Sequence, residues 1–426
     1  MRLIIKNGKI VDTKELCEYQ GTVVCENGVI TGIYKGDEAF PSEEGDEVID
    51  AAGLSVAPGL VDVHVHFRDP GFTHKEDIYT GAEAAKAGGF TTVVCMANTR
   101  PVTDNAETLT YVLDKGRETG INVLAAAAVT EGMKGSSITD FKALRAAGAA
   151  GFTDDGIPIM DEEIVREALT RSCEMRVPVS FHEENPELID NNGVNRGAAS
   201  EYYGIGGSPR EAEISLIERD LKIALETGGI INIQHISSRE GVELVRQAKM
   251  KGSNIHAEAT PHHFTLTEQA VIEHGTYAKM NPPLRTEDDR RAIVEGLRDG
   301  TIDIIATDHA PHAAEEKAKA ITEAPSGIIG LETSLSLAVT TLKDREGMDM
   351  PTILRAMTYA PALLYGLDCG VIAKDAPADI VIFDENSIKT YTEYRSRAVN
   401  TPFTGMELHG QVVYTICGGH VVYTAH

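Results

Sequence analysis

The sequence predicts an α/β protein, a (β/α)8 TIM-type barrel with a small β domain built from both termini, and three observations predict it. Residues 55–369 contain eight short apolar segments, each too hydrophobic to face water. Helix-like segments lie between them, which is the alternation of a parallel barrel. Both ends of the chain are rich in short strands, and neither end has enough strands to be stable alone.

The two ends, residues 1–54 and 370–426, are predicted to assemble into one composite β-sandwich domain. Asn7-Gly8 and Asn27-Gly28 lie between apolar runs, and Asn-Gly in this position is the strongest short-range signal for a hairpin turn. Near the other end, Gly418-Gly419 separates two similar runs. The strands expected around these turns are residues 3–6, 9–11, 22–25, 29–34, 379–383, 411–417 and 420–424.

The middle of the chain, residues 55–369, is the predicted metal-dependent catalytic barrel. Its expected strands are residues 55–66, 91–97, 122–128, 149–153, 177–182, 230–235, 254–259 and 303–307. The helix-like segments between them include residues 77–88, 161–175, 208–227, 239–251 and 286–300, and several of these end in glycine, as helices commonly do. Chemistry in such barrels lies at the carboxyl ends of the strands, so the residues found there indicate the function.

The first barrel strand ends in His64 and His66. Residues two apart in a strand point to one face, so these imidazoles project together while Val63 and Val65 point into apolar packing. Two neutral imidazoles are good ligands for a borderline divalent ion such as zinc, and Arg68 can hold an anion beside it. Taken alone, this stretch could also be a strand with two polar surface histidines.

Other predicted strands also end in residue types that bind metals. The fourth runs into Asp154 and Asp155, the fifth ends in His182, the sixth in His235 and the eighth in Asp308. A single histidine at a strand end is usually a packed or rim residue, but the whole set at the strand ends, with none at the starts, favours ligands. Because strand ends of a closed barrel converge on its axis, the set can hold two metal ions.

The composition excludes several classes of function. The 39 basic and 65 acidic side chains give a net charge of −26, so neither a nucleic-acid surface nor a polybasic lipid-binding segment is indicated. No run of about 18 apolar residues occurs, which argues against a membrane span. The six cysteines form no CxxC pair and are expected to be reduced thiols of a cytoplasmic protein. An anionic substrate would need a locally positive site.

Further motifs follow one another through the barrel. The first is Asp62-x-His64-x-His66-Phe67-Arg68-Asp69-Pro70, and the last is Ala306-Thr307-Asp308-His309-Ala310-Pro311-His312, followed by Lys317. Between them lie Met96-Ala97-Asn98-Thr99, Asp154-Asp155-Gly156, Thr260-Pro261-His262-His263 and Met280-Asn281-Pro282-Pro283-Leu284-Arg285. With these motifs the chain resembles the amidohydrolase superfamily and, within it, the class I bacterial dihydroorotases.

The resemblance implies two zinc ions per subunit. Many relatives bridge the ions with a carboxylated lysine, but no lysine lies between Lys142 and Lys222, so an aspartate must replace it. The family's spacing favours Asp155 over Asp154, and strand parity turns these two neighbours to opposite sides. The implied ligands are His64, His66 and Asp308 for one ion, His182 and His235 for the other, and Asp155, together with a hydroxide, as the bridge.

The implied reaction is the zinc-dependent, reversible cyclisation of N-carbamoyl-L-aspartate to (S)-dihydroorotate in de novo pyrimidine (UMP) biosynthesis. Zinc would polarise the carbonyl and lower the pKa of a bridging water from about 15.7 towards 7. Asp308 is the implied catalytic proton carrier. Arg68, Asn98 and His312, the last either neutral or protonated, are expected to hold the substrate carboxylate, and Asn281 to meet the ring amide.

The same resemblance adds His66 and the backbone of Ser326 and Gly327 to the expected substrate contacts. The family usually has an aromatic residue before this glycine, whereas the chain reads Pro325-Ser326-Gly327. We therefore expect weaker packing against the substrate ring and a lower affinity.

Two other functions stay open on sequence alone. A hydantoinase, dihydropyrimidinase or allantoinase would share the barrel and the zinc chemistry, but such enzymes resemble the lysine-bridged group and usually lack the full clamp of Arg68, Asn98 and His312. A non-catalytic scaffold for aspartate carbamoyltransferase would have lost metal ligands, which are all present here. As partners we expect the small-molecule substrate, a second copy in a homodimer and aspartate carbamoyltransferase, with no nucleic acid and no membrane.

Overall fold

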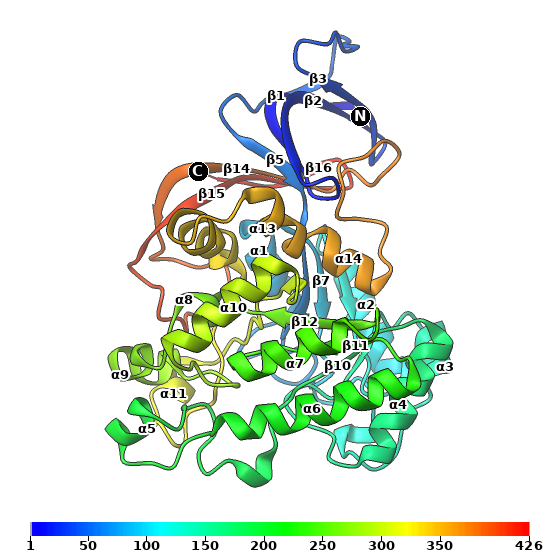
Figure 1. Ribbon diagram of the computed structural model, residues 1–426. Helices are drawn as coiled ribbons and strands as arrows, with labels where there is room; N and C mark the ends of the chain where they lie inside the picture. Colours follow the sequence, from blue (N-terminus) through cyan, green and yellow to red (C-terminus); the bar gives the residue numbers. More distant parts are fainter. Residues whose placement is uncertain (1, 426) are drawn as a thin grey trace.

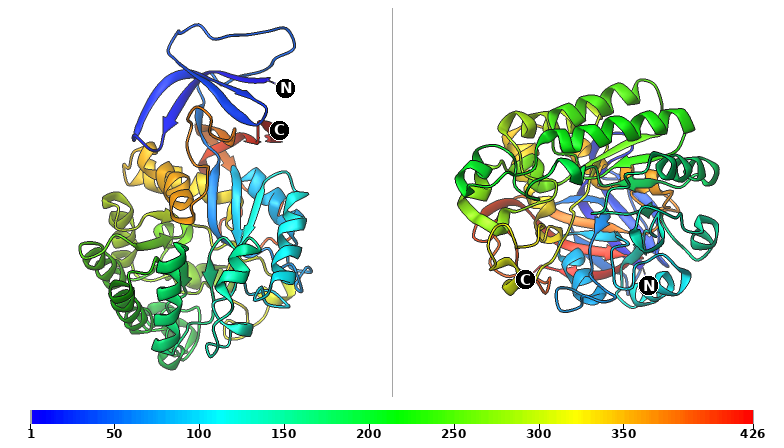
Figure 2. Two further views of the ribbon diagram at one scale, coloured as in Figure 1. Left: turned by 90° about the vertical axis from the view of Figure 1, so that its right-hand side faces the viewer. Right: turned by 90° about the horizontal axis from the view of Figure 1, so that it is seen from below.

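The computed structural model describes residues 2–425, and in it a body of helices and parallel strands carries a β layer at one end (Figure 1). The strands of this layer are β1 (Arg2–Asp12), β2 (Cys17–Glu26), β3 (Val29–Lys35), β4 (Glu47–Asp50), β5 (Ser55–Pro58), β14 (Ile380–Thr390), β15 (Glu407–Cys417) and β16 (His420–Thr424). Both termini lie at this end of the molecule (Figure 2).

Strands from both ends of the chain share one eight-stranded sheet, in the order β16-β15-β14-β5-β1-β2-β3 with β4 beside β1. The link is β5, which pairs in parallel with β1 and antiparallel with β14. Buried side chains from both ends, among them Leu3, Val23 and Ile382, form one hydrophobic core. The two ends therefore fold together, while the limits at residues 54 and 370 and the sandwich arrangement stay predictions.

Two of the predicted hairpin turns are confirmed and one is wrong. At Asn27-Gly28 and Gly418-Gly419 all four residues have positive φ and the flanking strands pair antiparallel. At Asn7-Gly8 there is no hairpin, because β1 continues through it and its register against β2 shifts between Ile5 and Gly8. Asn7, with φ 60°, is the extra residue of a β-bulge. The left-handed conformation that asparagine adopts in a hairpin turn also occurs in β-bulges, so the Asn-Gly pair fits both.

The body contains two parallel sheets. Their strands are β6 (Leu60–Val65), β7 (Phe90–Cys95), β8 (Asn122–Ala125), β9 (Phe152–Thr153), β10 (Val179–Phe181), β11 (Ile231–Ile233), β12 (Ile255–Ala259) and β13 (Ile304–Ile305). One sheet has the order β6-β7-β8 and the other β13-β12-β11-β10-β9. Parallel bridges join the two sheets at both edges, from Ala127 to Phe152 and from Val65 to His309.

The segment predicted as the first barrel strand, residues 55–66, is two strands. β5 belongs to the sheet of the chain ends, and β6 begins the body at Leu60. Gly59 lies between them; its N–H donates to Asp379 O at 2.8 Å, and an added Cβ would lie 2.2 Å from the Thr91 side chain. Both strands are buried throughout, so their apolar composition did not reveal the break.

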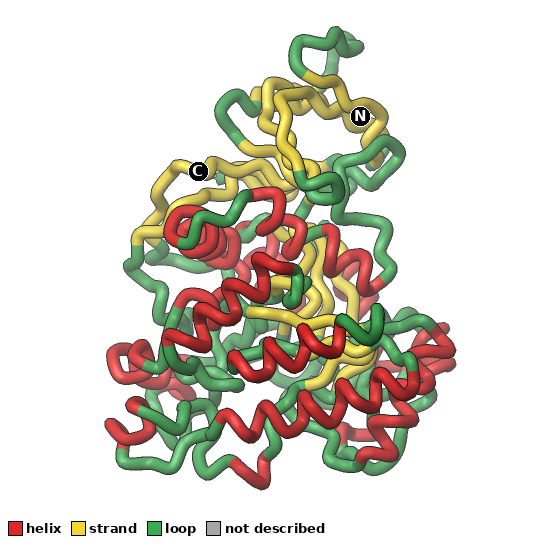
Figure 3. The backbone as a smooth tube through the Cα atoms, in the orientation of Figure 1, coloured by secondary structure: helices red, strands yellow, loops and turns green. Residues whose placement is uncertain are grey.

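Helices cover the outside of the body strands, as the red segments around the yellow ones show in Figure 3. They are α1 (Ile78–Ala87), α2 (Ala106–Arg117), α3 (Phe141–Ala146), α4 (Glu162–Met175), α5 (Ala198–Tyr203), α6 (Arg210–Thr227), α7 (Arg239–Lys249), α8 (Pro261–Thr265), α9 (Gln269–His274), α10 (Glu287–Asp299), α11 (Ala314–Lys317), α12 (Ser334–Leu337), α13 (Met350–Met357) and α14 (Tyr359–Tyr365). The five helix-like segments named from the sequence coincide with α1, α4, α6, α7 and α10. Side-chain caps fix where several of these helices begin. At the start of α1, for example, the Asp77 side chain accepts a hydrogen bond from the Thr80 N–H.

Candidate active site

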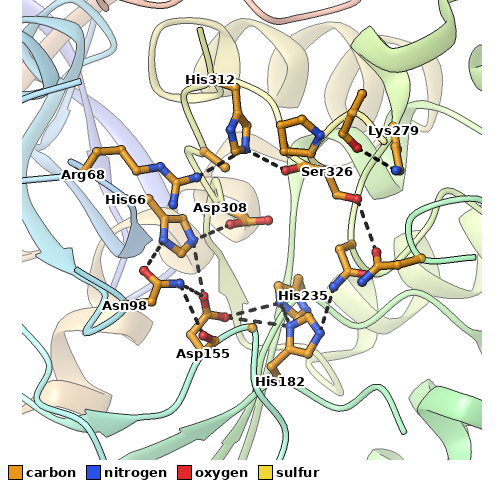
Figure 4. Close-up of a pocket in the computed structure, with 17 residues that line it drawn as sticks. His66, Arg68, Asn98, Asp155, His182, His235, Lys279, Asp308, His312 and Ser326 are labelled. Atoms are coloured by element: carbon orange, nitrogen blue, oxygen red, sulfur yellow. Dashed lines mark hydrogen bonds and ion pairs between the residues drawn. The ribbon is translucent and has the colours of Figure 1, made fainter. Parts of the chain in front are cut away.

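A cavity of about 370 Å³ opens where β6, β9, β10 and β11 end (Figure 4). Every residue predicted for the site except His64 lines this cavity, and His64 lies beneath it in contact with Asp155. The cavity is also lined by Gly156, Asn192, Lys279, Ala310, Ala324 and Pro325. The structure therefore brings the predicted residues together from across the chain, whereas their individual roles stay predictions.

Strand β6 and the residue after it place His64 and His66 on one face. Each imidazole is oriented through Nδ1: that of His64 lies 3.0 Å from Glu258 Oε2, and that of His66 lies 3.0 Å from Asn98 Oδ1. These contacts fix the orientation of both rings and turn Nε2 of each toward Asp155.

Asp155 lies between two histidine pairs. Its Oδ1 is 3.3 Å from His64 Nε2, and its Oδ2 is 3.4 Å from His66 Nε2. On the other side, Oδ1 is 3.9 Å from His182 Nδ1 and 3.8 Å from His235 Nε2. Two potential metal-binding groups of three residues therefore share this carboxylate.

Asp154 points away from this cluster. Its carboxylate accepts from the N–H groups of Val129 at 2.8 Å and Thr130 at 3.1 Å, and from the Thr130 hydroxyl. The neighbouring aspartates thus face opposite sides, and Asp155 is the one that faces the four histidines.

The second histidine pair has its own carboxylate. His182 Nδ1 lies 2.9 Å from His235 Nε2. On the far side of the imidazole, His182 Nε2 lies 3.5 Å from Glu184 Oε2, while Ser208 donates to the other oxygen of Glu184 at 2.9 Å. Asn281 Nδ2 lies 3.2 Å from the same His182 nitrogen. Glu184 thus lies behind His182 as Glu258 lies behind His64, but at a longer distance and without a hydrogen bond.

Asp308 completes the group around β6. Its Oδ1 lies 3.0 Å from His66 Nε2 and 3.5 Å from His64 Nε2. The preceding residue, Thr307, donates from its N–H at 3.2 Å and from its hydroxyl at 2.5 Å to the buried carboxylate of Asp62. Asp308 has φ 48°, an uncommon left-handed conformation that often marks functional sites.

These donors fit a metal cluster. His64 Nε2 and Asp155 Oδ1 are buried without a hydrogen-bond partner in the described residues. Two ligands of one tetrahedral zinc ion lie about 3.4 Å apart, given metal–ligand distances of about 2.1 Å. The contacts of His64 and His66 with Asp155 and Asp308 span 3.0–3.5 Å, which agrees with that spacing.

The histidines also set the charge of the two aspartates. Burial raises the pKa of Asp155 and of Asp308, but the neighbouring imidazoles outweigh burial and hold the pKa of both carboxyls well below the usual range. Both side chains are therefore anionic near neutral pH, as metal ligands must be.

Arg68 lies across the cavity from His182 (Figure 4). Its Nε donates to Pro311 O at 3.2 Å. Burial lowers the pKa of the guanidinium, although Asp308 and Asp155 act in the opposite direction, and arginine keeps its proton. Among the described residues no carboxylate oxygen lies within 4.0 Å of the Arg68 nitrogens. The guanidinium therefore faces the cavity without a counter-ion.

His312 is a neutral donor to the backbone. Its Nε2 lies 2.8 Å from Ser326 O, so this nitrogen carries the proton, and Nδ1 lies 3.3 Å from Lys75 Nζ. Burial, with the charges of Arg68, Lys75 and Lys317, lowers the pKa of His312 to about 2. Of the two protonation states that the sequence left open, the structure supports the neutral one.

Two lysines hold the loop beside His312. Lys279 Nζ donates to Ala324 O at 2.7 Å, and Lys317 Nζ donates to Pro325 O at 2.9 Å and to Gly327 O at 3.0 Å. Buried lysine side chains thus fix the carbonyl groups of a loop that has no regular secondary structure.

Ser326 and Gly327 have different structural roles in this loop. The Ser326 hydroxyl donates to Asn192 Oδ1 at 3.3 Å, so a hydrogen bond to another loop occupies the position where an aromatic ring was expected. Gly327 has φ 112°, and an added Cβ would lie 2.6 Å from Ala310 Cβ, so this position requires glycine.

Sequence reasoning missed Glu258, Glu184 and Lys279. Glu258 is an acid inside an apolar strand, and that pattern could have identified it because carboxylates are rarely buried without a partner. Glu184 and Lys279 lie in loops, where no periodic pattern distinguishes them from surface residues.

A family model matches part of the chain, and curated relatives match it over nearly its full length. A family model described as dihydro-orotase-like matches residues 53–241. The chain is 51% identical over 423 residues to the dihydroorotase of Clostridioides difficile strain 630, covering 99% of this chain and 100% of the relative. It is 48% identical over 426 residues to the dihydroorotase of Lactococcus lactis subsp. lactis, covering 100% of both chains.

Solved structures with the same fold include two hydantoinases. The L-hydantoinase (dihydropyrimidinase) from Arthrobacter aurescens superposes with a TM-score of 0.87 at 25% identity, covering 99% of this chain and 96% of the other. The D-hydantoinase (dihydropyrimidinase) from a Thermus species gives 0.84 at 26% identity, with the same coverage. Within residues 2–425, no helix is long and apolar enough to cross a membrane.

Proposed function

The chain belongs to the dihydroorotase family, and from this premise we propose that it is a hydrolase of cyclic amides that interconverts N-carbamoyl-L-aspartate and (S)-dihydroorotate plus water in pyrimidine biosynthesis. The observation that carries the substrate assignment is Arg68, whose guanidinium has no counter-ion among residues 2–425 and shares a cavity with the histidine–aspartate cluster. Dihydroorotate offers the two features that this cavity matches, a cyclic amide and a carboxylate.

We also propose that the two parallel sheets form one closed (β/α)8 barrel, since the bridges from Ala127 to Phe152 and from Val65 to His309 link both pairs of edge strands. In that arrangement the ligands lie at the carboxyl ends of the strands around one axis.

The metals are proposed to be two zinc ions. When bound, they polarise the amide carbonyl and make a water molecule easier to deprotonate. The proposed ligands are His64, His66 and Asp308 for one ion, His182 and His235 for the other, and Asp155 for both. The donor types would also accept cobalt or manganese.

Asp308 is the proposed proton carrier. In the hydrolytic direction it accepts a proton from the attacking water and delivers it to the ring nitrogen that leaves; in the cyclising direction the proton moves the opposite way. Its contact of 3.0 Å with His66 Nε2 and the anchoring of Thr307 to Asp62 keep the carboxylate in place for both transfers.

Substrate recognition is assigned to the opposite wall. Arg68 pairs with the carboxylate, for which guanidinium is suited because it forms two parallel hydrogen bonds and keeps its charge. Asn98 and the neutral His312 line the same cavity. We assign His66 to the reacting carbonyl, and Asn281 with the backbone of Ser326 and Gly327 to the ring. Asn98 has a second task, because its Nδ2 donates to Asp155 Oδ2 at 3.2 Å.

The test is an assay of the purified protein with dihydroorotate, hydantoin and allantoin, together with elemental analysis for zinc. We expect dihydroorotate to be the preferred substrate and about two zinc ions per chain. Preference for hydantoin or allantoin would favour the related cyclic amidohydrolases instead. Absence of both turnover and zinc would favour the scaffold function.

The assembly and the location of the protein are further predictions. A homodimer and an association with aspartate carbamoyltransferase are both checked by the mass of the purified protein, alone and mixed with that enzyme. A cytoplasmic location is checked by cell fractionation.

A further inference from the structure

The connection between β14 and β15, residues 391–406, extends from the sheet of the chain ends to the substrate side of the cavity, and we call it the strap. It contains Asn400, which is 1% exposed and has no part in the chemistry described above. The strap belongs to a part of the chain that supplies no residue to the cavity lining.

Asn400 makes four hydrogen bonds to two loops of the site. Its Oδ1 accepts from the His312 N–H at 3.1 Å, and its Nδ2 donates to Ala310 O and to Gly327 O, each at 3.1 Å. Its backbone carbonyl accepts from the Ile329 N–H at 3.0 Å. One amide thus ties the loop after β13 to the loop that carries Gly327, and all three side-chain bonds are to backbone groups.

The strap itself is anchored independently of Asn400. The buried carboxylate of Glu332 accepts from the Arg395 N–H at 2.8 Å and the Ser396 N–H at 3.1 Å. Glu76, which is also buried, accepts from the Arg397 N–H at 3.1 Å and from the Ser396 hydroxyl. Asn400 is therefore presented to the two loops from a fixed support.

We propose that Asn400 is a positioning residue for substrate binding: it holds the backbone of His312 and Gly327 at the distance from Arg68 that the substrate requires. The inference rests on the proposed function, because it assigns these residues to the substrate wall. It implies that the sheet formed by the two chain ends is a working part of the active site.

The metal cluster does not depend on Asn400. Asp308 is held by His66 and by the anchoring of Thr307 to Asp62, and within residues 2–425 none of the proposed ligands has a hydrogen bond or ion pair with the strap. Without the Asn400 amide, Ala310 O and the His312 N–H lose this buried partner, while Gly327 O retains Lys317 Nζ, so the two loops must shift or admit water. The effect should therefore appear in KM, with kcat and bound metal nearly unchanged.

The experiment compares Asn400→Leu with Thr401→Val in the full-length protein. Leucine has a similar branched shape but cannot form hydrogen bonds. Thr401 is also buried in the strap, and in the described part of the chain its hydroxyl has a single hydrogen bond, accepted from the Phe403 N–H at 3.3 Å, so Thr401→Val is the matched control. For Asn400→Leu we expect KM for dihydroorotate to rise about tenfold or more, kcat to stay within about threefold, and zinc content to match the wild type; Thr401→Val should change none of these.

An unchanged KM in Asn400→Leu, or a fall in kcat at constant KM, would overturn the inference, because both indicate a residue that serves stability alone. If Asn400→Leu does not fold, the same criteria apply to Asn400→Ser, which keeps a polar group. Failure of the proposed function is distinguishable, since the wild-type protein would then not turn over dihydroorotate at all.

Discussion

The two walls of the cavity are built on different principles. The metal wall consists of His64, His66, Asp155, His182, His235 and Asp308. Its side chains lie at or just after strand ends, and buried carboxylates or amides contact the imidazoles on the side away from the cluster.

The substrate wall consists of Arg68, His312 and residues 324–327. Its groups are largely backbone atoms of loops, and basic side chains or Asn400 hold them. The strand ends thus position the proposed metal ligands, whereas distant residues hold the proposed recognition groups, and we expect changes in the second set to leave the chemistry unaltered.

The largest effect is expected in the metal wall. Replacement Asp308→Asn should lower kcat for dihydroorotate by about 10³-fold, because the amide cannot carry the proton, while most of the zinc stays bound through the remaining ligands. Steady-state kinetics and elemental analysis check both parts. Turnover close to the wild-type rate would remove Asp308 from the proton path.

The buried carboxylate of Glu258, which contacts His64 and lies outside the cavity, is expected to affect the affinity for zinc. Replacement Glu258→Gln keeps the shape but weakens the contact with His64 Nδ1, so we expect about 10- to 100-fold weaker zinc binding, measured by competition with a chelator. Glu385→Gln is the control, since Glu385 is also buried but bonds to Ser55 in the sheet of the chain ends. Equal zinc affinities in the two variants would contradict the orienting role.

A smaller effect is expected from a buried lysine of the substrate wall, Lys317. Burial, reinforced by Lys279, lowers the pKa of Lys317 from 10.5 to about 7. Between these pH values the unfolded chain binds more protons at this residue than the folded chain. The free energy of unfolding should therefore rise with pH, relative to Lys317→Met, by up to about 1.4 kcal/mol per pH unit.

Urea unfolding at pH 7, 8 and 9 measures this dependence, with the exposed Lys319→Met as the control. A difference between wild type and Lys317→Met that stays constant across this range would show that Lys317 is charged throughout. In that case its two carbonyl contacts would outweigh its burial.

Residue patterns alone predicted the histidines and aspartates of the metal wall, whereas most of the substrate wall was predicted through the family resemblance, and the reason is physical. Parity within a strand placed His64 and His66 together, and strand ends converge, so local patterns sufficed. The break at Gly59 was not predicted because the apolar residues on both sides of it also fit one longer strand. The bulge at Asn7 was not predicted because Asn-Gly between apolar runs also fits a hairpin turn. Glu258 lies 194 residues from His64, its hydrogen-bond partner, and such long-range pairs leave no periodic signal. The same holds for Asn400 and Lys279.

The most direct test of this division is the ratio of kcat/KM for dihydroorotate to that for dihydrouracil, which is the same ring without the carboxylate, in the wild type and in Arg68→Met. We predict that the wild type strongly prefers dihydroorotate, and that Arg68→Met raises KM and loses most of the preference while its kcat/KM for dihydrouracil stays near the wild-type value. If Arg68→Met lowered kcat/KM for both substrates equally, Arg68 would serve the metal chemistry, and the separation of the two walls would be contradicted.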